Sequence, residues 1–412
     1  MTPLIRLVRI ITLLSLLSPL LIGEDIVSDS WSRHTIDNSS LGADGVRTAD
    51  VNGDGLPDLV AGWEQGGVSR IYLMQRNGGA IPTWEMIEVG AAPSVEDALL
   101  VDLDRDGAID VVSSTEGKNR KLVVHWAPSD PAHYADESRW QTETLFADES
   151  KWMFATSMDI DGQNGPDLVV GGKNEDARVG WLESPADARD IAAWQFHPLT
   201  DVTWTMSIMN EDVDGDGIVD VVVSDRKGEQ EGVFWLRNPG SALEKLRKPW
   251  AKTWFADDLV ETTLIDFADM DGDGDAEVVV PHQSKAGARW VTRLDRMKNG
   301  YWHRTTIPVP GSANTPKAVK VADINLDGRA DLVVSFEKSK DPTTSGIIWH
   351  EQSSNDWISH DVSGVEGIKF DLNLVIDIDG DGDLDIVNTE ENNNAQGGEA
   401  GLGLVWYENP LR

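Results

Sequence analysis

Residues 212–223 read DVDGDGIVDVVV, and this stretch decides the fold. Within nine residues it carries four carboxylates, those of Asp212, Asp214, Asp216 and Asp220. Two like charges about 4 Å apart repel by roughly 4 kcal/mol near a protein surface, so the loop calls for a cation. Oxygen ligands at alternating positions around a glycine suit calcium. A β-branched run follows, and Val223 stands where an EF-hand has its Glu, so the pattern predicts a calcium loop inside a β-hairpin.

The acidic loop recurs along the whole chain. Its first residue is Asp50, Asp102, Asp159, Asp212, Asp269, Asp323 and Asp377 in turn, at spacings of 52 to 57 residues. Self-similarity at such a period indicates an array or a propeller, and it outweighs the two or three domains that length alone suggests.

Each repeat carries four short apolar segments. One precedes the acidic loop, as in residues 96–101, and one follows it, as in residues 168–172. The third segment carries a tryptophan in six repeats, namely Trp126, Trp181, Trp235, Trp290, Trp349 and Trp406, with Tyr72 in the first. The fourth opens with a tryptophan: Trp31, Trp84, Trp140, Trp194, Trp250, Trp302 and Trp357. Four short strands per repeat predict the blade of a β-propeller.

The two ends of the repeat region complement each other. The chain stops after a third-type segment, residues 401–410, and the repeats begin with an isolated fourth-type segment, residues 31–36. We expect residues 31–36 to complete the last blade, which removes a free sheet edge. The sequence therefore predicts an all-β fold: a single seven-bladed β-propeller of four-stranded blades over residues 24–412, closed by its N-terminal strand.

The D-x-[DN]-x-D-G-x-x-D loop followed by a DLVV-type strand resembles the VCBS/FG-GAP repeat family. These are calcium-binding propellers similar to the head of the integrin α-subunit, and fungal aldos-2-ulose dehydratase looks more distantly related. The resemblance covers nearly the whole chain after residue 23. It implies that ligands meet the face opposite the calcium loops, but it does not fix an activity, because propellers host many.

The resemblance and ligand chemistry agree on loop positions 1, 3, 5 and 9 as calcium ligands. The expected ligands are Asp50, Asn52, Asp54 and Asp58; Asp102, Asp104, Asp106 and Asp110; Asp159, Asp161 and Asp167; Asp212, Asp214, Asp216 and Asp220; Asp269, Asp271, Asp273 and Glu277; Asp323, Asn325, Asp327 and Asp331; and Asp377, Asp379, Asp381 and Asp385. The third loop has Gln163 at position 5 and its glycine displaced to Gly165, so we expect that site to be weak or empty. Up to seven structural Ca²⁺ ions are expected, and the alternative is a solvated acidic turn without metal.

Composition and the N-terminal residues indicate the location of the protein and limit its partners. Residues 1–23 carry Arg6 and Arg9 before an apolar run, which predicts a signal peptide and a secreted protein, periplasmic or extracellular. The chain has no cysteine, so no disulfide supports the fold. A formal net charge of −36 disfavours a nucleic-acid partner. We expect a monomer without a membrane span.

Several candidate ligand-binding residues map to the face opposite the calcium loops. Trp63, Trp152 and Trp204 could stack on sugar rings there, or else plug the central channel. Lys173, Arg226, His282 and Lys317 form a basic arc suited to an acidic sugar. The remaining charged residues of this face are expected to be solvated: Asp44, Glu64, Glu96, Glu116, Glu261, Glu337, Asp371 and Glu390.

Three functions fit this pattern. The first is a module that binds a carbohydrate or another surface polymer. The second is a polysaccharide lyase or sugar dehydratase, in which Arg226 or a lysine neutralises a carboxylate and His282 takes the α-proton. Such chemistry usually needs a second acid, often tyrosine, and none of the four tyrosines maps clearly to this face. The third is an adhesion scaffold with a protein partner.

Overall fold

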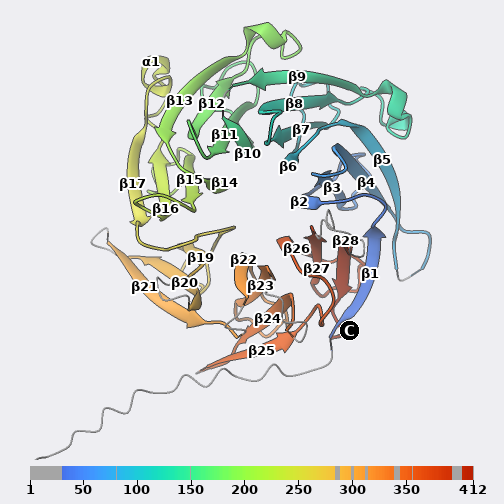
Figure 1. Cartoon of the computed structure of the whole chain (residues 1–412), viewed down its shortest axis with the longest axis vertical. Coiled ribbons are helices and arrows are strands. Elements are labelled where there is room, and N and C mark those ends of the chain that lie inside the picture. Colours follow the sequence, from blue (N-terminus) through green and yellow to red (C-terminus); the bar gives the residue numbers. More distant parts are fainter. Residues whose placement is uncertain are drawn as a thin grey trace, which may run out of the picture.

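The structure is a computed structural model that describes residues 30–79, 81–148, 150–283, 288–297, 301–310, 314–337, 344–354, 356–391 and 401–411. The expected signal peptide, residues 1–23, lies outside these ranges. In the described ranges, seven four-stranded antiparallel sheets stand as blades around a central axis (Figure 1). The prediction of an all-β, seven-bladed propeller is therefore confirmed.

The first four blades follow the chain in order, with the innermost strand first. Blade 1 contains β2 (Ala43–Ala49), β3 (Asp58–Trp63), β4 (Val68–Gln75) and β5 (Thr83–Ala91). Blade 2 contains β6 (Val95–Val101), β7 (Asp110–Thr115), β8 (Lys121–Trp126) and β9 (Gln141–Ala147). Blade 3 contains β10 (Lys151–Met158), β11 (Asp167–Lys173), β12 (Arg178–Glu183) and β13 (Gln195–Asp201). Blade 4 contains β14 (Thr205–Glu211), β15 (Asp220–Asp225), β16 (Gly232–Arg237) and β17 (Ala251–Ala256).

The remaining blades complete the ring. Blade 5 contains β18 (Asp266–Ala268), β19 (Glu277–Gln283), β20 (Arg289–Arg296) and β21 (Trp302–Pro308). Blade 6 contains β22 (Thr315–Ala322), β23 (Asp331–Glu337), β24 (Ile347–Gln352) and β25 (Trp357–Asp361). Blade 7 contains β26 (Phe370–Ile376), β27 (Asp385–Glu390), β28 (Gly403–Glu408) and β1 (Ser32–Asp37). Blade 5 is the irregular one, because its innermost strand has three residues where the others have seven or eight.

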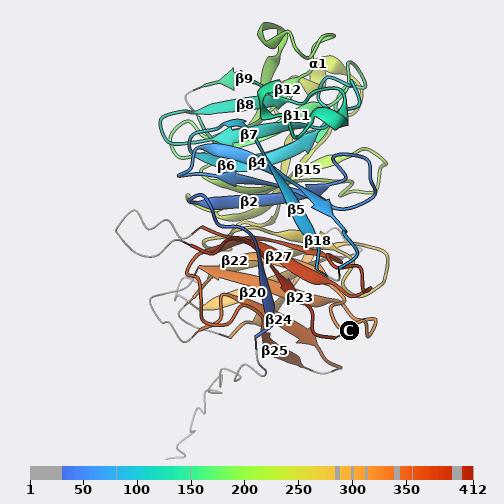
Figure 2. The same ribbon diagram turned by 90° about the vertical axis from the view of Figure 1, so that its right-hand side faces the viewer.

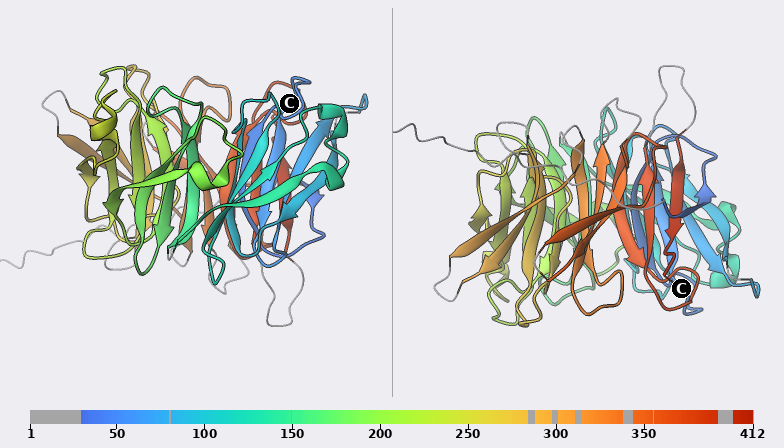
Figure 3. Two further views of the ribbon diagram at one scale, coloured as in Figure 1. Left: turned by 90° about the horizontal axis from the view of Figure 1, so that it is seen from above. Right: turned by 90° about the horizontal axis from the view of Figure 1, so that it is seen from below.

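Short helical turns occupy connections between third and fourth strands. They are η1 (Pro131–His133), η2 (Glu137–Arg139), η3 (Ile191–Ala193) and α1 (Leu243–Leu246). The described part of the chain contains no helix with the length and apolar character needed to span a bilayer. Seen from the side, the ring is a flat disc (Figure 2), and the connections project from its two faces (Figure 3).

The N-terminal strand closes the ring as predicted. β1 pairs antiparallel with β28, with Ser32 opposite Glu408 and His34 opposite Trp406, and the blue strand lies outermost beside the red blade in Figure 1. The His34 ring stacks on Trp406 with 4.3 Å between centroids. The strand thus covers the edge of β28 that would otherwise expose unpaired backbone groups.

The core lies in layers between neighbouring blades. One apolar cluster, for example, joins Trp126 and Leu99 of blade 2 to Leu168 and Trp194 of blade 3. The valines that follow the acidic loop, such as those at 221–223, are fully buried. A sheet buried on both faces by its neighbours explains why these strands read as continuous apolar runs. The repeat tryptophans therefore serve mainly to hold blade against blade.

Candidate functional site

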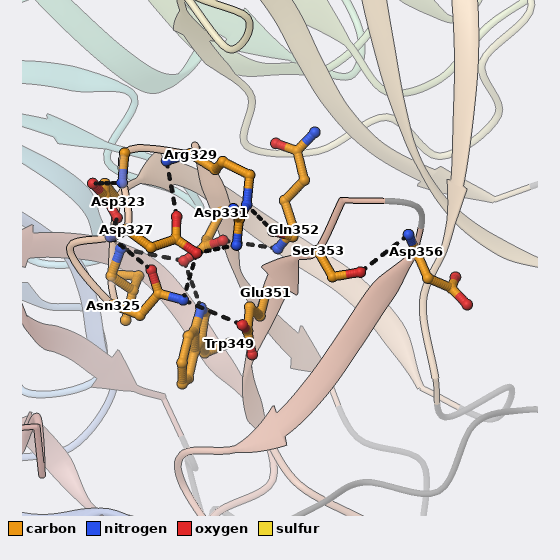
Figure 4. A network of polar contacts seen from close by, with 12 residues as sticks. Asp323, Asn325, Asp327, Arg329, Asp331, Trp349, Glu351, Gln352, Ser353 and Asp356 are labelled. Atoms are coloured by element: carbon orange, nitrogen blue, oxygen red, sulfur yellow. Dashed lines mark hydrogen bonds and ion pairs between the residues drawn. The ribbon is translucent and has the colours of Figure 1, made fainter.

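The acidic loops connect the first and second strands of each blade at one face of the disc. Figure 4 shows the sixth loop, in which the Asp323 carboxylate accepts backbone N–H groups of Asp327 (2.9 Å) and Gly328 (2.8 Å). Asp212 likewise accepts three backbone N–H groups in the fourth loop. The first aspartate of the loop therefore fixes the turn and aims the following carboxylates at a common centre.

The carboxylate at the ninth loop position also accepts backbone hydrogen bonds that the sequence did not predict. The Asp331 carboxylate accepts the N–H of Ile324 (3.3 Å) through one oxygen and that of Gln352 (2.8 Å) through the other. It thereby ties the acidic turn to the third strand of the same blade (Figure 4). The equivalent carboxylates with both ties are Asp58, Asp110, Asp167, Asp220 and Asp385. Burial raises the pKa of Asp331 to about 6.

At least three of the loops meet the geometric requirement for a metal ion. In each, one oxygen of every carboxylate lies within 4.8 Å of the others: Asp102, Asp104 and Asp110; Asp159, Asp161 and Asp167; and Asp269, Asp271, Asp273 and Glu277. Calcium–oxygen distances of 2.3–2.6 Å allow one ion to touch all oxygens of such a set. In the second loop, moreover, Asp102 Oδ1 is buried without a hydrogen-bond partner. The donor sets therefore fit a hard cation, and the third loop keeps three converging carboxylates despite Gln163.

A polar pocket lies on the axis at the opposite face and is called the axial pocket here. Its volume is about 340 Å³. Seven carboxylates and four cations line it together with Met153, Phe154, Trp204 and Met206; the charged residues are Asp44, Glu64, Glu96, Glu116, Glu337, Asp371, Glu391, Lys173, Arg226, Lys317 and Lys369. They come from the starts of first strands and from the ends of second strands, where the sequence predicted the ligand face.

The cations of the axial pocket are paired with carboxylates, mostly from a neighbouring blade. Lys173 contacts Glu96 (3.1 Å) and also Glu116. Lys317 lies 3.3 Å from Asp371, and Lys369 contacts Glu391. Arg226 binds Glu261 at 2.7 Å, outside the pocket lining. The predicted basic arc therefore exists as a set of ion pairs in a pocket with more carboxylates than cations.

Burial and neighbouring charges shift the pKa values of three of these carboxyls. Burial raises the pKa of Asp44 well above its usual value, and the neighbouring charges of Asp371 and Glu96 add to the effect. Burial acts to raise the pKa of Asp371 as well, but Lys317 and Lys369 overcome it and hold that pKa low. Burial also raises the pKa of Glu96 to about 7 against the opposing charge of Lys173. The pocket thus holds carboxyls with raised pKa values beside a carboxyl whose pKa is lowered.

The raised pKa of Glu96 predicts a specific dependence of stability on pH. Between pH 4.5 and 7 the folded protein holds a proton on Glu96 that the unfolded chain releases, so stability falls as pH rises through this window. Glu96→Gln should remove this loss, which amounts to at most about 1.4 kcal/mol per pH unit. Urea unfolding at pH 5 and pH 7.5 measures it. The exposed Glu229→Gln serves as control, and an unchanged pH slope in Glu96→Gln would contradict the assignment.

Four of the predicted ligand residues meet in the axial pocket: Lys173, Trp204, Arg226 and Lys317. The Trp204 ring, however, is engaged by cations, with Lys173 Nζ 4.8 Å and the Arg226 guanidinium 5.3 Å from its centroid. Its apolar side packs against a core cluster. Trp204 therefore positions the pocket cations more than it offers a free face for stacking on a sugar.

Trp63 and Trp152 do not present their rings to a ligand, contrary to the first interpretation. Both side chains are 0% exposed and belong to apolar clusters between blades. The Trp63 indole N–H donates to the Tyr72 hydroxyl at 2.9 Å. Counting residues from the acidic loop gave the correct face of the disc, but strand alternation turns these two side chains into the blade interface.

His282 lies outside the axial pocket, so its predicted place in the basic arc is wrong. It lines a separate groove of blade 5 together with Asp258, Trp290 and Arg304. Its Nδ1 donates to the Gln283 carbonyl (3.0 Å), so Nε2 accepts from the Thr292 hydroxyl (2.8 Å). Burial lowers its pKa. Both nitrogens are thus engaged, and His282 does not share a pocket with Lys173, Arg226 or Lys317.

The sequence missed Lys369, Glu391 and Phe154 as pocket residues. Two of them lie side by side in blade 7, where the Glu391 N–H donates to the Lys369 carbonyl at 2.8 Å. Glu390, expected at the rim, turns inward and accepts N–H groups from Ile368 and Leu402, both at 2.7 Å. Glu391 then takes the place in the pocket.

Comparison with known proteins agrees with this architecture. The FG-GAP-like repeat family model matches residues 50–113 and 212–280, so the chain contains FG-GAP-like repeats. A structure of the Photorhabdus luminescens Tc holotoxin pore is similar over 92% of this chain with 18% identity and a TM-score of 0.40, and the chain spans only 14% of its length. A structure described as a gluconolactonase is similar over 94% of this chain and 95% of its own, with 9% identity and a TM-score of 0.42. At such identities and scores, neither likeness bears on function.

Proposed function

We propose that this propeller of FG-GAP-like repeats is a secreted, calcium-stabilised module that binds carbohydrate in its axial pocket. The carrying observation is the convergence of eleven charged side chains on one 340 Å³ pocket. Sugar hydroxyls both donate and accept hydrogen bonds, so a wall on which ammonium and carboxylate groups alternate can satisfy them at many points. The calcium ions would be held by the acidic loops on the opposite face, and they supply charge neutralisation and rigidity there.

The charge balance of the pocket favours neutral or amine-bearing sugars over the acidic sugars expected from sequence. Each pocket cation already has a carboxylate partner. A uronate would have to displace one of these partners, and a buried carboxylate that loses its cation is strongly destabilised. A neutral sugar can instead bridge an existing pair without breaking it.

The test is calorimetric titration of the calcium-loaded protein with neutral, amine-bearing and uronic-acid oligosaccharides. We expect neutral or amine-bearing oligosaccharides to bind, and Glu337→Gln on the pocket wall to weaken them about tenfold, as for loss of one charged hydrogen bond. Glu229→Gln, the exposed control, should bind normally. Preferential binding of uronates, or equal affinity in both variants, would contradict the assignment.

N-terminal sequencing of protein from the culture medium would test secretion and cleavage near residue 23.

A further inference from the structure

A second cavity lies on the axis beneath the axial pocket and is called the axial cavity here. Its volume is about 350 Å³. The innermost strands line both spaces, earlier residues facing the pocket and later ones the cavity: Asp44 precedes Val46 on β2, and Asp371 precedes Leu374 on β26. Phe154 and Met206 line both spaces. At about 3.3 Å per strand residue, the cavity lies roughly 7–10 Å deeper along the same axis.

The wall of the axial cavity is mostly apolar. Of its fifteen lining residues, eleven are apolar and four are polar, namely Arg47, Thr48, Ser207 and Lys320. The sequence patterns gave no sign of this cavity, because its aliphatic residues lie on strands that otherwise read as ordinary core.

The polar side chains of the cavity are already bonded to the protein. Arg47 makes two hydrogen bonds to Asp97, at 2.9 and 2.7 Å. Lys320 Nζ lies 2.8 Å from Asp266 Oδ1, and the Thr48 hydroxyl donates to the Asp58 carbonyl at 2.8 Å. Ser207 accepts the Ile265 N–H at 3.1 Å. With these polar groups already paired and the rest of the wall apolar, the space favours an apolar occupant over a polar one.

We infer that the axial pocket and axial cavity form one composite site for an amphiphilic glycoside, a sugar that carries an apolar group. The sugar lies among the paired charges of the pocket, and the apolar group passes Phe154 and Met206 into the cavity. This rests on the proposed carbohydrate function for the sugar half. The apolar group of the ligand is inferred only from the apolar wall of the axial cavity.

The experiment measures affinity for methyl, butyl and hexyl β-glucosides, below the concentrations at which these compounds associate. Each methylene buried in the cavity should raise affinity about fourfold, so hexyl glucoside with its chain fully buried should bind on the order of a thousandfold more tightly than methyl glucoside. Leu372→Trp, which fills the cavity, should abolish this gain, so that hexyl and methyl glucoside bind this variant with similar affinity. Leu374→Phe, a smaller change, should reduce the gain and guards against a folding defect in the first variant. Met86→Trp, at an exposed methionine on β5, is the control.

The outcomes separate the two proposals. A chain-length gain that the cavity-filling variants remove supports the composite site. A flat chain-length series in a protein that still binds oligosaccharides overturns the composite site and leaves the proposed function intact. A gain that persists in Leu372→Trp and Leu374→Phe places the alkyl chain elsewhere and also overturns it. Absence of binding by all oligosaccharides and by methyl glucoside counts against the proposed function, whatever the alkyl chain does.

Discussion

Removal of divalent cations with EDTA is expected to lower the apparent Tm of the propeller by roughly 15–25 °C. A site filled at a hundredfold excess over its Kd adds about 2.7 kcal/mol. In a ring of about 380 residues, each kcal/mol shifts Tm by about 1 °C or slightly more. Arginines already pair with some loop carboxylates, as Arg237 does with Asp214 (2.6 Å) and Asp216 (3.0 Å), but the loops remain dense in carboxylates in a chain of net charge −36, and no disulfide supports them. Differential scanning calorimetry with and without EDTA measures the shift.

The same experiment separates calcium from general ionic effects. Excess Ca²⁺ should restore the Tm, and Mg²⁺ should restore less, because Mg²⁺ keeps its waters and demands octahedral geometry. Asp271→Asn in the fifth loop should remove one site and cost about 2–3 kcal/mol only when calcium is present. Asp190→Asn, an exposed aspartate outside the loops, is the control. Identical unfolding with EDTA and with calcium would refute a structural role for the metal.

A chain that begins at residue 39 instead of residue 30 is expected to lose at least about 5 kcal/mol of stability and to aggregate. The shorter chain lacks β1 and with it the pairing to β28, the buried ring of Trp31 and the 2.6 Å contact from Arg33 to Glu366. It leaves β28 as an exposed, apolar edge strand, which is a template for association between molecules.

The chain that begins at residue 30 is the control for this truncation. A chain that begins at residue 30 should unfold like the full-length protein, because it keeps β1 entire. A synthetic peptide of residues 30–38 should restore part of the lost stability when added in excess to the shorter chain. Equal Tm values for the chains beginning at 30 and 39 would show that the ring does not depend on its closing strand.

The fold was predictable because its signals are local and repeated. The acidic loop, the valines behind it and the two repeat tryptophans lie within one period, so a single repeat reveals the blade and seven reveal the ring. The face that holds the charged residues was also predictable, since each second strand starts at a fixed distance from its loop. Lys173, Arg226 and Lys317 consequently meet where the repeat places them.

The organisation of the pocket was not predictable, because its contacts join different blades. Lys173 pairs with Glu96, 77 residues earlier in the chain, and Lys317 pairs with Asp371 in the next blade. No pattern within one repeat shows that a lysine and a glutamate from separate repeats point at each other. Trp63 and His282 were placed wrongly for a different reason: residue counting gives the end of the blade at which a residue lies, but not the direction in which its side chain points.

The closing strand also determines when, during synthesis of the chain, the ring can finish folding. β1 is the earliest of the described strands to be synthesised, yet its partner β28 is among the last, 376 residues later when Ser32 is matched with Glu408. Contacts between such distant residues form late and slowly. While the ribosome completes the chain, residues 32–37 must remain unpaired and blades 1 to 6 must wait as an open arc. Synthesis of the final blade is therefore the event that lets the ring form, and a chain truncated near its C-terminus leaves both ends of the arc exposed.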